Sequence, residues 1–415
     1  MGEKMRIGIN LLDLHRHLGG AYQYAVTFVR HLLAYDRINQ YILFYTHKDF
    51  LEEELNLTGV TLVEVGKRPK VGLKLEGGVV RPGTLLRAAS ALGIPLPVCF
   101  IRGRYTVFAR WQLDLLIQPA HGFGAFFSGL PYIVSIHDCP YQWNKDMRKH
   151  RKSYDIWANN LHAKALASKA VAVLVDSEAG KEALMRGYGI PAHKICILSF
   201  RVPDYVSSDL DTTRLAAVKK KYELPDFYLF FPSVILPHKN HLGLLAALDI
   251  LRHQYQLEVP LILVGARGVN GSFDKVMGRV RELNMGDQVR YLGYVPDEDM
   301  PSLYKLAGAL VFPTFMGPTS IPIIEAFAAG CPVICSNVEG YGDQVGDAGI
   351  LVDPTSPNDL AQAIYSVYTD RNLRERLIEK GRVRLNQLSS GDYGKRIFEI
   401  VQGVLENGQA VILCE

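Results

Sequence analysis

The sequence predicts an α/β protein made of two doubly wound domains, each built on a mainly parallel sheet. The chain has 415 residues, more than the about 250 to 300 at which a single hydrophobic core stops growing. With 48% hydrophobic and 21% charged residues it is globular, which excludes disordered, collagen-like and disulfide-rich classes. Short apolar, β-branched runs alternate with longer amphipathic segments along the chain, as they do in βαβ units.

Each of the apolar runs predicts a strand. In the first half they are residues 6–11, 41–46, 60–65, 115–118, 132–137, 171–176 and 194–198. In the second half they are residues 228–233, 261–265, 289–294, 309–313, 333–336 and 350–353. Helices are expected between them, the first with apolar residues at helical spacing from Ala21 to Leu32. Doubly wound sheets bind ligands beyond the carboxyl ends of their strands, so we expect a site in a cleft between the two domains.

The domain border is expected where Pro, Asp and Ser residues interrupt the periodicity, between residues 200 and 225. We place an N-terminal Rossmann-like domain at residues 1–205 and a C-terminal one at 206–392. Residues 393–415 form a C-terminal segment that is expected to pack back on the N-terminal domain. Residues 67–110 are rich in Gly and Pro, show no clear period and are interpreted as an insertion.

The net charge of +4 hides an asymmetry between the two halves. Residues 1–205 contain 26 Lys and Arg against 17 Asp and Glu, a balance of +9, and the rest contains 20 against 25, a balance of −5. The basic residues gather in 67–110 and 145–152. This pattern predicts a face for an anionic acceptor or membrane surface, or else a solvated basic face. No nucleic-acid-binding module accompanies the charge, so we expect no nucleic acid partner.

The chain ends and the cysteines indicate a cytoplasmic protein without a structural metal. The first apolar stretch is interrupted by Asn10 and is too short for a signal peptide or a membrane span. Six scattered cysteines include no C-x-x-C pair, which is typical of a reducing compartment. Two acidic triplets, residues 209–211 and 297–299, are interpreted as linker and helix-capping residues. We therefore expect no metal requirement.

Residues 312–336 predict an anion site at the start of a helix. A strand ends near residue 313, a glycine-containing loop follows, and Pro322 is expected at the first helical position. Unpaired backbone N–H groups there, with the helix dipole, would bind an anion. The candidate residues of this loop are Gly317, Pro318, Thr319, Ser320 and Ile321. Glu325 is expected in the first turn but outside the capping-box position, where it would face the cleft and accept hydrogen bonds from ligand hydroxyls.

A second candidate group is Lys239, which follows Pro237 and His238 at a predicted strand-to-helix turn. Its ammonium could meet a phosphate group, and the alternative is an exposed first-turn lysine that the helix dipole disfavours. His238 and His241 lack a carboxylate partner in the pattern, so they are expected to be a surface and a packing histidine rather than metal ligands.

The first half offers weaker signals. Gly19 and Gly20 precede the first helix and could form a ligand-binding loop or a plain turn. His137 ends a predicted strand, where it would either point into the cleft or be a satisfied buried histidine. Ser177 and Glu178 follow the next strand and could belong to the site or cap a helix.

Four motifs in this order carry a resemblance to a known family. They are P-H-K-N-H at 237–241, L-I-L-V-G at 261–265, V-R-Y-L-G-Y-V-P-D-E-D-M-P-S-L-Y at 289–304 and G-P-T-S-I-P-I-I-E-A-F-A-A-G-C-P-V-I at 317–334. The chain resembles the retaining glycosyltransferases of family 4, most specifically over residues 231–353. The resemblance implies the GT-B fold, in which two Rossmann-like domains face each other across a cleft.

The resemblance also implies an activity and a site. A hexose would move from a nucleotide-diphospho-sugar to a glycan or lipid-linked acceptor, with retention and without a cofactor or metal, in polysaccharide or glycolipid assembly at the inner face of a membrane. The implied catalytic residues are His137, Lys239 and Glu325. The implied donor-binding residues are Gly19, Gly20, Gly265, Gly317, Pro318, Thr319, Ser320, Ile321 and Glu325.

Two departures from the family pattern leave alternatives open. Gly317 stands where the E-x7-E element has its first glutamate, and Val234 stands where many relatives carry arginine. A sugar-nucleotide epimerase with the GT-B fold is one alternative, although the acid and base carboxylates it needs have no motif here. A catalytically silent sugar-nucleotide-binding protein is the other, and the Gly317 departure motivates it.

Overall fold

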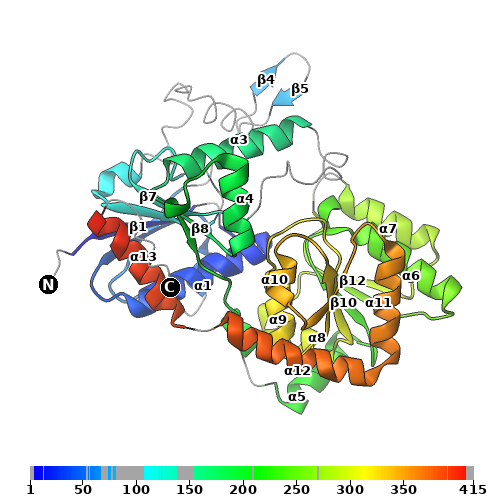
Figure 1. Ribbon diagram of the computed structural model, residues 1–415. Helices are drawn as coiled ribbons and strands as arrows, with labels where there is room; N and C mark the ends of the chain where they lie inside the picture. The colour runs from blue at the N-terminus through cyan, green and yellow to red at the C-terminus, as the bar shows by residue number, and fades with distance from the viewer. Residues whose placement is uncertain are drawn as a thin grey trace. The chain divides into compact units, whose positions relative to one another are not determined.

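The protein is described here from a computed structural model (Figure 1). The described residues are 4–12, 14–52, 55, 57–66, 73–75, 78–80, 107–120, 122, 124–137, 153–207, 210–268, 271–389 and 391–407. The chain divides into two compact units, one formed by Met1–Ser199 with Gly391–Glu415 and the other by Phe200–Ser390.

The first unit contains a seven-stranded parallel sheet in the order β3-β2-β1-β6-β7-β8-β9. Its strands are β1 (Arg6–Leu11), β2 (Gln40–Tyr45), β3 (Thr61–Glu64), β6 (Leu115–Gln118), β7 (Tyr132–Ser135), β8 (Ala172–Val175) and β9 (Ile195–Ile197). Its α-helices are α1 (Gly20–Tyr35), α3 (Ser153–Lys169), α4 (Glu178–Tyr188) and α13 (Tyr393–Asn407). A separate antiparallel pair, β4 (Leu73–Leu75) and β5 (Gly78–Val80), lies in the segment expected to be an insertion.

The last helix, α13, belongs to the first unit and packs on α1 (Figure 1). The rings of His31 and Tyr393 lie 5.2 Å apart between centroids, and those of Tyr35 and Phe398 lie 5.5 Å apart. Aromatic pairs of this kind contribute about 0.5 to 1.5 kcal/mol beyond the area they bury. The C-terminal segment is therefore a structural part of the N-terminal sheet's helical layer.

The second unit contains a six-stranded parallel sheet in the order β12-β11-β10-β13-β14-β15. Its strands are β10 (Leu229–Pro232), β11 (Leu261–Val264), β12 (Val289–Gly293), β13 (Ala309–Phe312), β14 (Val333–Ser336) and β15 (Gly349–Val352). Its α-helices are α5 (Thr212–Lys221), α6 (His241–Gln254), α7 (Ser272–Glu282), α8 (Met300–Leu306), α9 (Ile321–Ala329), α10 (Tyr341–Val345), α11 (Pro357–Thr369) and α12 (Arg371–Leu388).

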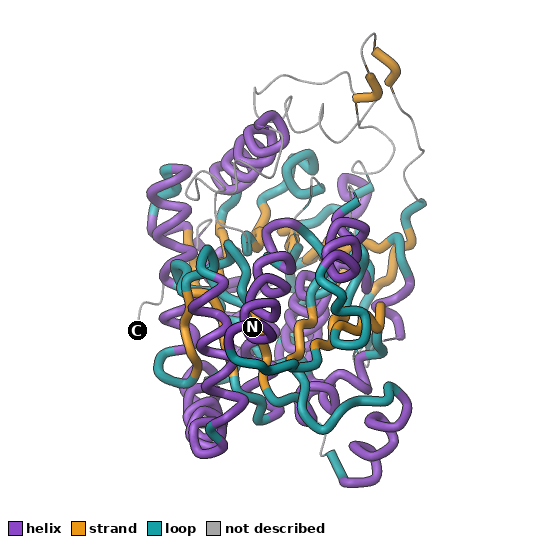
Figure 2. The backbone as a smooth tube through the Cα atoms, turned by 90° about the vertical axis from the view of Figure 1, so that its right-hand side faces the viewer, coloured by secondary structure: helices purple, strands orange, loops and turns teal. Residues whose placement is uncertain are grey.

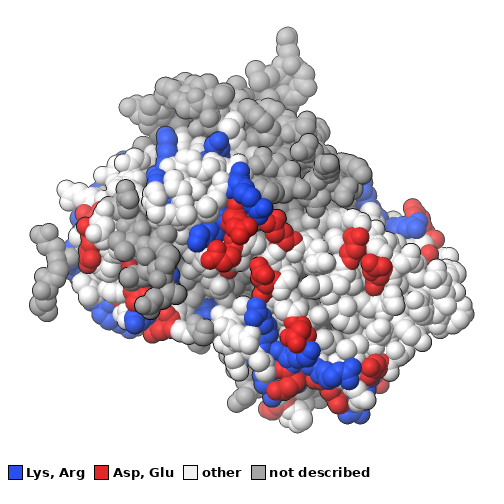
Figure 3. Space-filling model, viewed as in Figure 1, with Lys and Arg blue, Asp and Glu red and all other residues white. Residues whose placement is uncertain are grey.

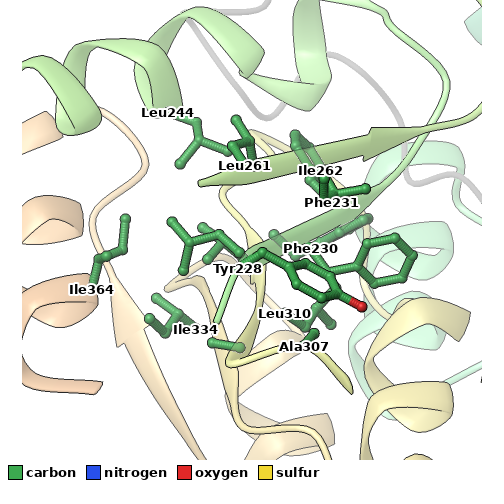
Figure 4. Packing of buried hydrophobic residues seen from close by; sticks show 14 of the residues in the cluster. Tyr228, Phe230, Phe231, Leu244, Leu261, Ile262, Ala307, Leu310, Ile334 and Ile364 are labelled. Carbon is green, nitrogen blue, oxygen red and sulfur yellow. The ribbon is translucent and has the colours of Figure 1, made fainter. Parts of the chain in front are cut away.

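Aromatic side chains form the centre of the second unit's core. Tyr228, Phe230 and Phe231 on and beside β10 are fully buried among aliphatic residues of neighbouring strands and helices (Figure 4). The Phe230 ring packs edge-on against Tyr304 of α8, 4.9 Å between centroids. Helices cover both faces of each sheet (Figures 1 and 2), which explains why the strands read as continuous apolar runs rather than alternating ones.

The predicted fold class, α/β with two doubly wound parallel sheets, is confirmed. Each predicted strand is present, and strand ends differ from the predicted ones by at most two residues. In both sheets the strand order reverses beside the first strand, between β1 and β6 in the first unit and between β10 and β13 in the second. Such switch points are where doubly wound sheets bind ligands.

Candidate functional site

The turn after β10 carries Lys239 and is held in place by Asn240. Residues Pro237–Lys239 form a short 3-10 turn, and Asn240 takes a left-handed conformation, φ 61°, before α6 begins. The Asn240 amide donates to the carbonyls of Pro313 (3.0 Å) and Pro354 (2.8 Å), which follow β13 and β15. Its amide oxygen caps the first turn of α6. One side chain therefore ties the Lys239 turn to two other strand ends.

The loop after β13 is bonded directly to the same turn. The N–H of Phe315 (2.8 Å) and the hydroxyl of Thr314 (3.0 Å) both donate to the carbonyl of His238. Because His238 precedes Lys239, these bonds place the lysine beside the loop that leads to Gly317. The two segments that the sequence singled out are thus neighbours at the switch point of the second sheet.

Gly317 has a backbone conformation that favours glycine. Its φ is 124°, a backbone angle that residues other than glycine rarely adopt. A Cβ atom at this position would also lie 3.3 Å from the hydroxyl oxygen of Tyr341. The position where the family pattern has its first glutamate is therefore built on a glycine backbone, and a glutamate would require a different loop conformation.

Some backbone groups of the loop before α9 are already hydrogen-bonded to a protein side chain. Ser320, the residue that precedes α9, donates its N–H to the Gln344 amide oxygen (2.8 Å) and accepts from the Gln344 amide nitrogen (2.9 Å). The expectation of unpaired N–H groups is therefore wrong for Ser320, because its N–H donates to the side chain of Gln344 on α10. Pro318 and the side chain of Ile321 are buried, and Thr319 is half-buried.

Glu325 is buried and its carboxylate holds two hydroxyl groups. Because α9 begins at Ile321 and Pro322 is its second residue, Glu325 is the fifth helical residue, and the expectation that it lies in the first turn is wrong. One carboxylate oxygen accepts from the hydroxyl of Tyr205 and the other from that of Tyr304. Burial raises the pKa of Glu325, and the two tyrosine hydroxyls oppose that shift. Sequence reasoning missed both tyrosines, which no motif connects to Glu325.

Gly265 follows β11, the strand next to β10 on the other side. Its φ is 131°, and a Cβ atom there would lie 2.5 Å from the carbonyl oxygen of Ser233. Its N–H donates to the carbonyl of Gly293 (2.8 Å), and its carbonyl accepts from the hydroxyl of Tyr291 (2.7 Å). Gly265 thus allows the chain segments after β10 and β11 to approach closely, while protein groups hold both of its backbone polar atoms.

In the first unit the glycine loop is connected to His137 through one helical turn. Gly19 precedes α1 and Gly20 is its first residue. The same turn region carries Tyr24, whose ring packs edge-on against His137, 4.2 Å between centroids. The hydroxyl of Tyr24 lies 3.2 Å from Oγ of Ser135, the last residue of β7. The ring of Tyr24, one helical turn after Gly20, thus connects the start of α1 with His137.

His137 follows β7 and pairs with Asp176, which follows the neighbouring strand β8. Nδ1 of His137 lies 2.8 Å from Oδ1 of Asp176, and the two side chains are 18% and 2% exposed. The pairing satisfies Nδ1, as a structural histidine requires; the side chain as a whole is partly exposed, and its Nε2 atom is buried. Sequence reasoning missed Asp176, although an acidic residue at the end of a predicted strand was a usable signal.

Polar side chains mark the carboxyl ends of four neighbouring strands in this sheet. Asn10 on β1 donates to Oε1 of Gln118 at the end of β6 (2.9 Å), and both are buried. Ser135 ends β7 and Asp176 follows β8. Buried polar groups cost free energy unless they are paired. Their gathering gives this edge of the sheet a polar lining.

Ser177 and Glu178 behave as the helix-cap alternative predicts. The Ser177 hydroxyl accepts from the N–H of Gly180 (3.1 Å) at the start of α4. Glu178 is exposed and lies 3.7 Å from the Lys181 ammonium. The cap interpretation is therefore confirmed for Ser177.

The residues considered as metal ligands have structural roles. His241 is buried and stacks on the Phe231 ring, 4.4 Å between centroids, and burial lowers its pKa to about 3, so the prediction of a packing histidine is confirmed. Among the described residues, no cluster of three or more His, Cys, Asp or Glu side chains could hold a metal ion.

In the second acidic triplet, the Asp299 side chain pairs with donors from α5 and the residue after it instead of capping α8. Asp299 is buried and accepts hydrogen bonds from Arg214 (2.9 Å), Lys221 (2.7 Å) and Tyr222 (2.8 Å), and it makes no side-chain cap bond to α8. Burial alone would raise the pKa of Asp299, but these donors leave it below its usual value. The capping expectation is wrong here because a buried carboxylate draws cationic partners from α5.

The basic surface expected in the first unit falls mostly on residues 67–106 and 145–152, which lie largely outside the described residues. On the face shown in Figure 3, described Lys and Arg side chains are interspersed with Asp and Glu. In the second unit, for example, two basic residues of α12 have acidic partners. Arg371 pairs with Glu375 of the same helix (2.9 Å), and Lys380 pairs with Asp347 (2.8 Å). None of the described helices combines the length and apolar character needed to cross a membrane.

Comparisons with known proteins give this site a family context. Residues 215–384 match the family model of the glycosyl transferases group 1. The O-antigen chain mannosyltransferase B of Escherichia coli is 32% identical over 259 residues, which cover 62% of this chain and 65% of that protein. The matched region thus spans less than two thirds of this relative's length.

Solved structures share the architecture at low sequence identity. Sucrose-phosphate synthase from Thermosynechococcus elongatus superposes with a TM-score of 0.72 at 20% identity, covering 96% of this chain and 98% of that one. HepE from Anabaena in complex with UDP-glucose gives a TM-score of 0.67 at 16% identity, covering 96% and 100%. These matches show that the chain has the GT-B fold, and that residues 215–384 within it are similar to the glycosyl transferases group 1.

Proposed function

We propose that the protein is a retaining hexosyltransferase that moves a hexose from a nucleotide-diphospho-sugar to a hydroxyl of a glycan or lipid-linked acceptor. The group 1 match supports glycosyl transfer. The name of the Escherichia coli relative supports mannose as the hexose and a cell-surface polysaccharide as the product. The observation that carries the proposal is the bonding of the Lys239 turn to the loop before Gly317 at the switch point of the second sheet.

In this proposal the second unit binds the donor diphosphate. The Lys239 ammonium, which lies 5.2 Å from the centroid of the Phe312 ring, supplies positive charge, and the amino end of α9 adds its dipole. Negative charge grows on the departing phosphate oxygen during transfer, so a fixed cation there stabilises the transition state more than the ground state. The charge comes from side chain and backbone rather than a metal ion, so EDTA should leave turnover unchanged.

The sugar passes through an oxocarbenium-like state, as in glycoside hydrolysis. We assign no covalent nucleophile; in a same-face route the departing phosphate oxygen takes the acceptor hydroxyl proton as the new glycosidic bond forms. His137 is proposed to contact the donor sugar. Glu325 is proposed to accept a hydrogen bond from a donor hydroxyl, in exchange for the one that Tyr205 gives it.

We further propose that the basic first unit meets an anionic acceptor, such as a polyprenyl-diphosphate-linked glycan, at the cytoplasmic face of a membrane. Its excess of 26 Lys and Arg over 17 Asp and Glu in residues 1–205 supports this. Each basic residue near an anionic surface contributes about 1 kcal/mol at physiological salt. Co-sedimentation with anionic liposomes that falls as salt rises is expected, and equal binding to neutral liposomes would remove the membrane part of the proposal.

The test of the proposed activity is a donor panel. The full chain is incubated with GDP-, UDP-, ADP- and dTDP-sugars, each with and without lipid-linked glycan acceptors, and released nucleoside diphosphate is measured. Acceptor-dependent release from one donor, with GDP-mannose tested first, is expected. Tight donor binding without turnover would instead indicate a silent binding protein, and conversion of the donor sugar without an acceptor would indicate an epimerase.

A further inference from the structure

The pairing of His137 with Asp176 joins two side chains from neighbouring strand ends, 39 residues apart in the chain. Nδ1 and Oδ1 are 2.8 Å apart, a distance typical of a hydrogen bond to a charged group. The Asp176 side chain is only 2% exposed, so its carboxylate has left bulk water. Burying a carboxylate costs free energy unless a donor meets it, so this position is built for the histidine that faces it.

The ring of His137 is also held from a second direction. Tyr24 of α1 meets it edge-on with an interplanar angle of 69°, and the Tyr24 hydroxyl lies 3.2 Å from Oγ of Ser135, the last residue of the strand that precedes the histidine. Burial, and next the charge of Asp176, raise the pKa of Tyr24. Tyr393 of α13 also interacts with the Tyr24 hydroxyl. The ring therefore contacts Asp176 after β8 and Tyr24 of α1, and Tyr24 is held in turn by Ser135 of β7 and Tyr393 of α13.

This arrangement determines which ring nitrogen a ligand can use. A carboxylate only accepts hydrogen bonds, so Nδ1 must carry the proton that it shares with Asp176. Any hydrogen bond from the ring to a substrate hydroxyl is then made by Nε2. A carboxylate behind a histidine is a common way to fix both the tautomer and the orientation of a functional imidazole.

From this geometry we infer that Asp176 is a positioning residue of the proposed transferase site, which fixes the tautomer and ring orientation of His137 so that Nε2 faces the sugar. The inference rests on the proposed function only for the identity of that ligand. It also separates Asp176 from the two adjacent residues that the sequence pattern singled out: Ser177 caps α4, and Glu178 is exposed.

The test reads the tautomer directly. The full chain is labelled with 15N-histidine, the His137 signals are assigned with the His137→Gln variant, and long-range proton–nitrogen spectra identify the protonated nitrogen of the neutral ring. The wild type should carry its proton on Nδ1. In Asp176→Ala and Asp176→Asn the proton should move largely to Nε2. A wild-type ring with an unprotonated Nδ1 would overturn the inference, and so would variants with an unchanged tautomer. The wild-type spectrum gives the first of these answers even where a variant does not fold.

Turnover supplies the second readout. Both Asp176 variants should lose about 10- to 100-fold, mainly in kcat rather than in the donor KM, which is the range for removing a residue that orients a functional histidine. A changed tautomer with undiminished kcat would also overturn the inference. If the wild type transfers no sugar at all, the proposed function fails, while the tautomer measurement still decides the role of Asp176.

The matched control is Asp36→Asn, which removes another buried carboxylate from the same unit. Asp36 is 5% exposed and accepts hydrogen bonds from the Tyr41 hydroxyl (2.6 Å) and the Asn39 amide (2.7 Å) at the end of α1. This variant should lower thermal stability while leaving the His137 tautomer and kcat unchanged. An Asp36→Asn loss of kcat equal to that of Asp176→Asn would mean that general destabilisation explains both, and would overturn the inference.

Discussion

The two units hold their candidate site residues in different ways. In the second unit main-chain groups fix the loops around Lys239: the His238 carbonyl, the Gly317 backbone, and the Pro313 and Pro354 carbonyls that the Asn240 side chain bonds. In the first unit paired side chains dominate, with His137 on Asp176 and their neighbours at the carboxyl ends of four strands.

This difference indicates which ligand groups each unit is suited to bind. Loops fixed by backbone bonds and glycine conformations form a charge-binding surface that does not change with pH, which suits a diphosphate. Paired imidazole, carboxylate and amide groups are directional donors and acceptors, which suits sugar hydroxyls. The predictions below test whether the two kinds of site respond differently to substitution.

The largest effect is expected for Lys239→Ala. Removing a fixed cation that faces developing charge should lower kcat/KM by about 100- to 1000-fold, with little loss of folding stability. Steady-state kinetics with the donor found in the panel measures it. The control is Lys275→Ala, which removes an exposed lysine of α7 in the same unit and should retain full activity. Equal activity of both variants would remove Lys239 from the site.

A smaller but still large effect is expected for Gly317→Glu, which restores the residue of the family pattern. Because φ is 124° at this position, the side chain should cost about 1 to 3 kcal/mol of stability and should not raise activity. The control is Gly286→Ala, where a Cβ atom would meet nothing within 4 Å and φ is not positive. A Gly317→Glu variant that is as stable as wild type and more active would show that the loop readily takes the other conformation.

Glu325→Gln should reveal a pH dependence of stability. Burial raises the pKa of Glu325 in the folded chain above its ordinary value of 4.5, so the folded state holds its proton to higher pH than the unfolded state. The contribution of this carboxyl to stability is therefore present at low pH and falls as the pH rises through that window. The unfolding free energy of wild type minus that of the variant should therefore decrease as the pH rises above the ordinary value of 4.5.

The measurement must report on the second unit. The three tryptophans, Trp111, Trp143 and Trp157, all precede residue 199, so their fluorescence follows the first unit. Hydrogen exchange of peptides from α8 and α9 in urea follows the region around Glu325 instead. A difference between wild type and variant that grows with pH would mean that the tyrosine hydroxyls outweigh burial.

The smallest effect is expected for Ser177→Ala. Loss of the cap bond to Gly180 should cost about 1 kcal/mol of stability and leave kcat/KM unchanged. Ser356→Ala, which removes the equivalent cap of α11, should cost a similar amount. Tryptophan fluorescence in urea measures the first variant and hydrogen exchange of α11 the second. A specific loss of turnover in Ser177→Ala would return this residue to the site.

The fold and the backbone-made part of the site could be predicted from the sequence because their signals are local. Strand runs and the spacing from Gly317 to Glu325 lie within single segments of the chain. They place the Lys239 turn and the 317–321 loop at the ends of two strands, and parallel topology makes such ends neighbours.

The pairings of the site residues could not be predicted, because the two members of each pair come from distant segments of the chain. Tyr205 and Tyr304 lie 120 and 21 residues from Glu325, and Asp176 lies 39 residues from His137. Only tertiary packing selects these pairs from many similar side chains. The predicted start of α9 was also wrong, by one residue. The helix begins at Ile321 rather than Pro322, and this places Glu325 outside the first turn.

Binding of nucleoside diphosphates tests the central claim most directly, namely that Lys239 and the adjacent loop hold the donor's diphosphate. Isothermal titration compares the preferred nucleoside diphosphate with its monophosphate on wild type, Lys239→Ala and Lys275→Ala. Wild type and Lys275→Ala should prefer the diphosphate, and Lys239→Ala should lose at least about tenfold in its affinity, or 1.4 kcal/mol. Equal diphosphate affinity in all three proteins would contradict the claim.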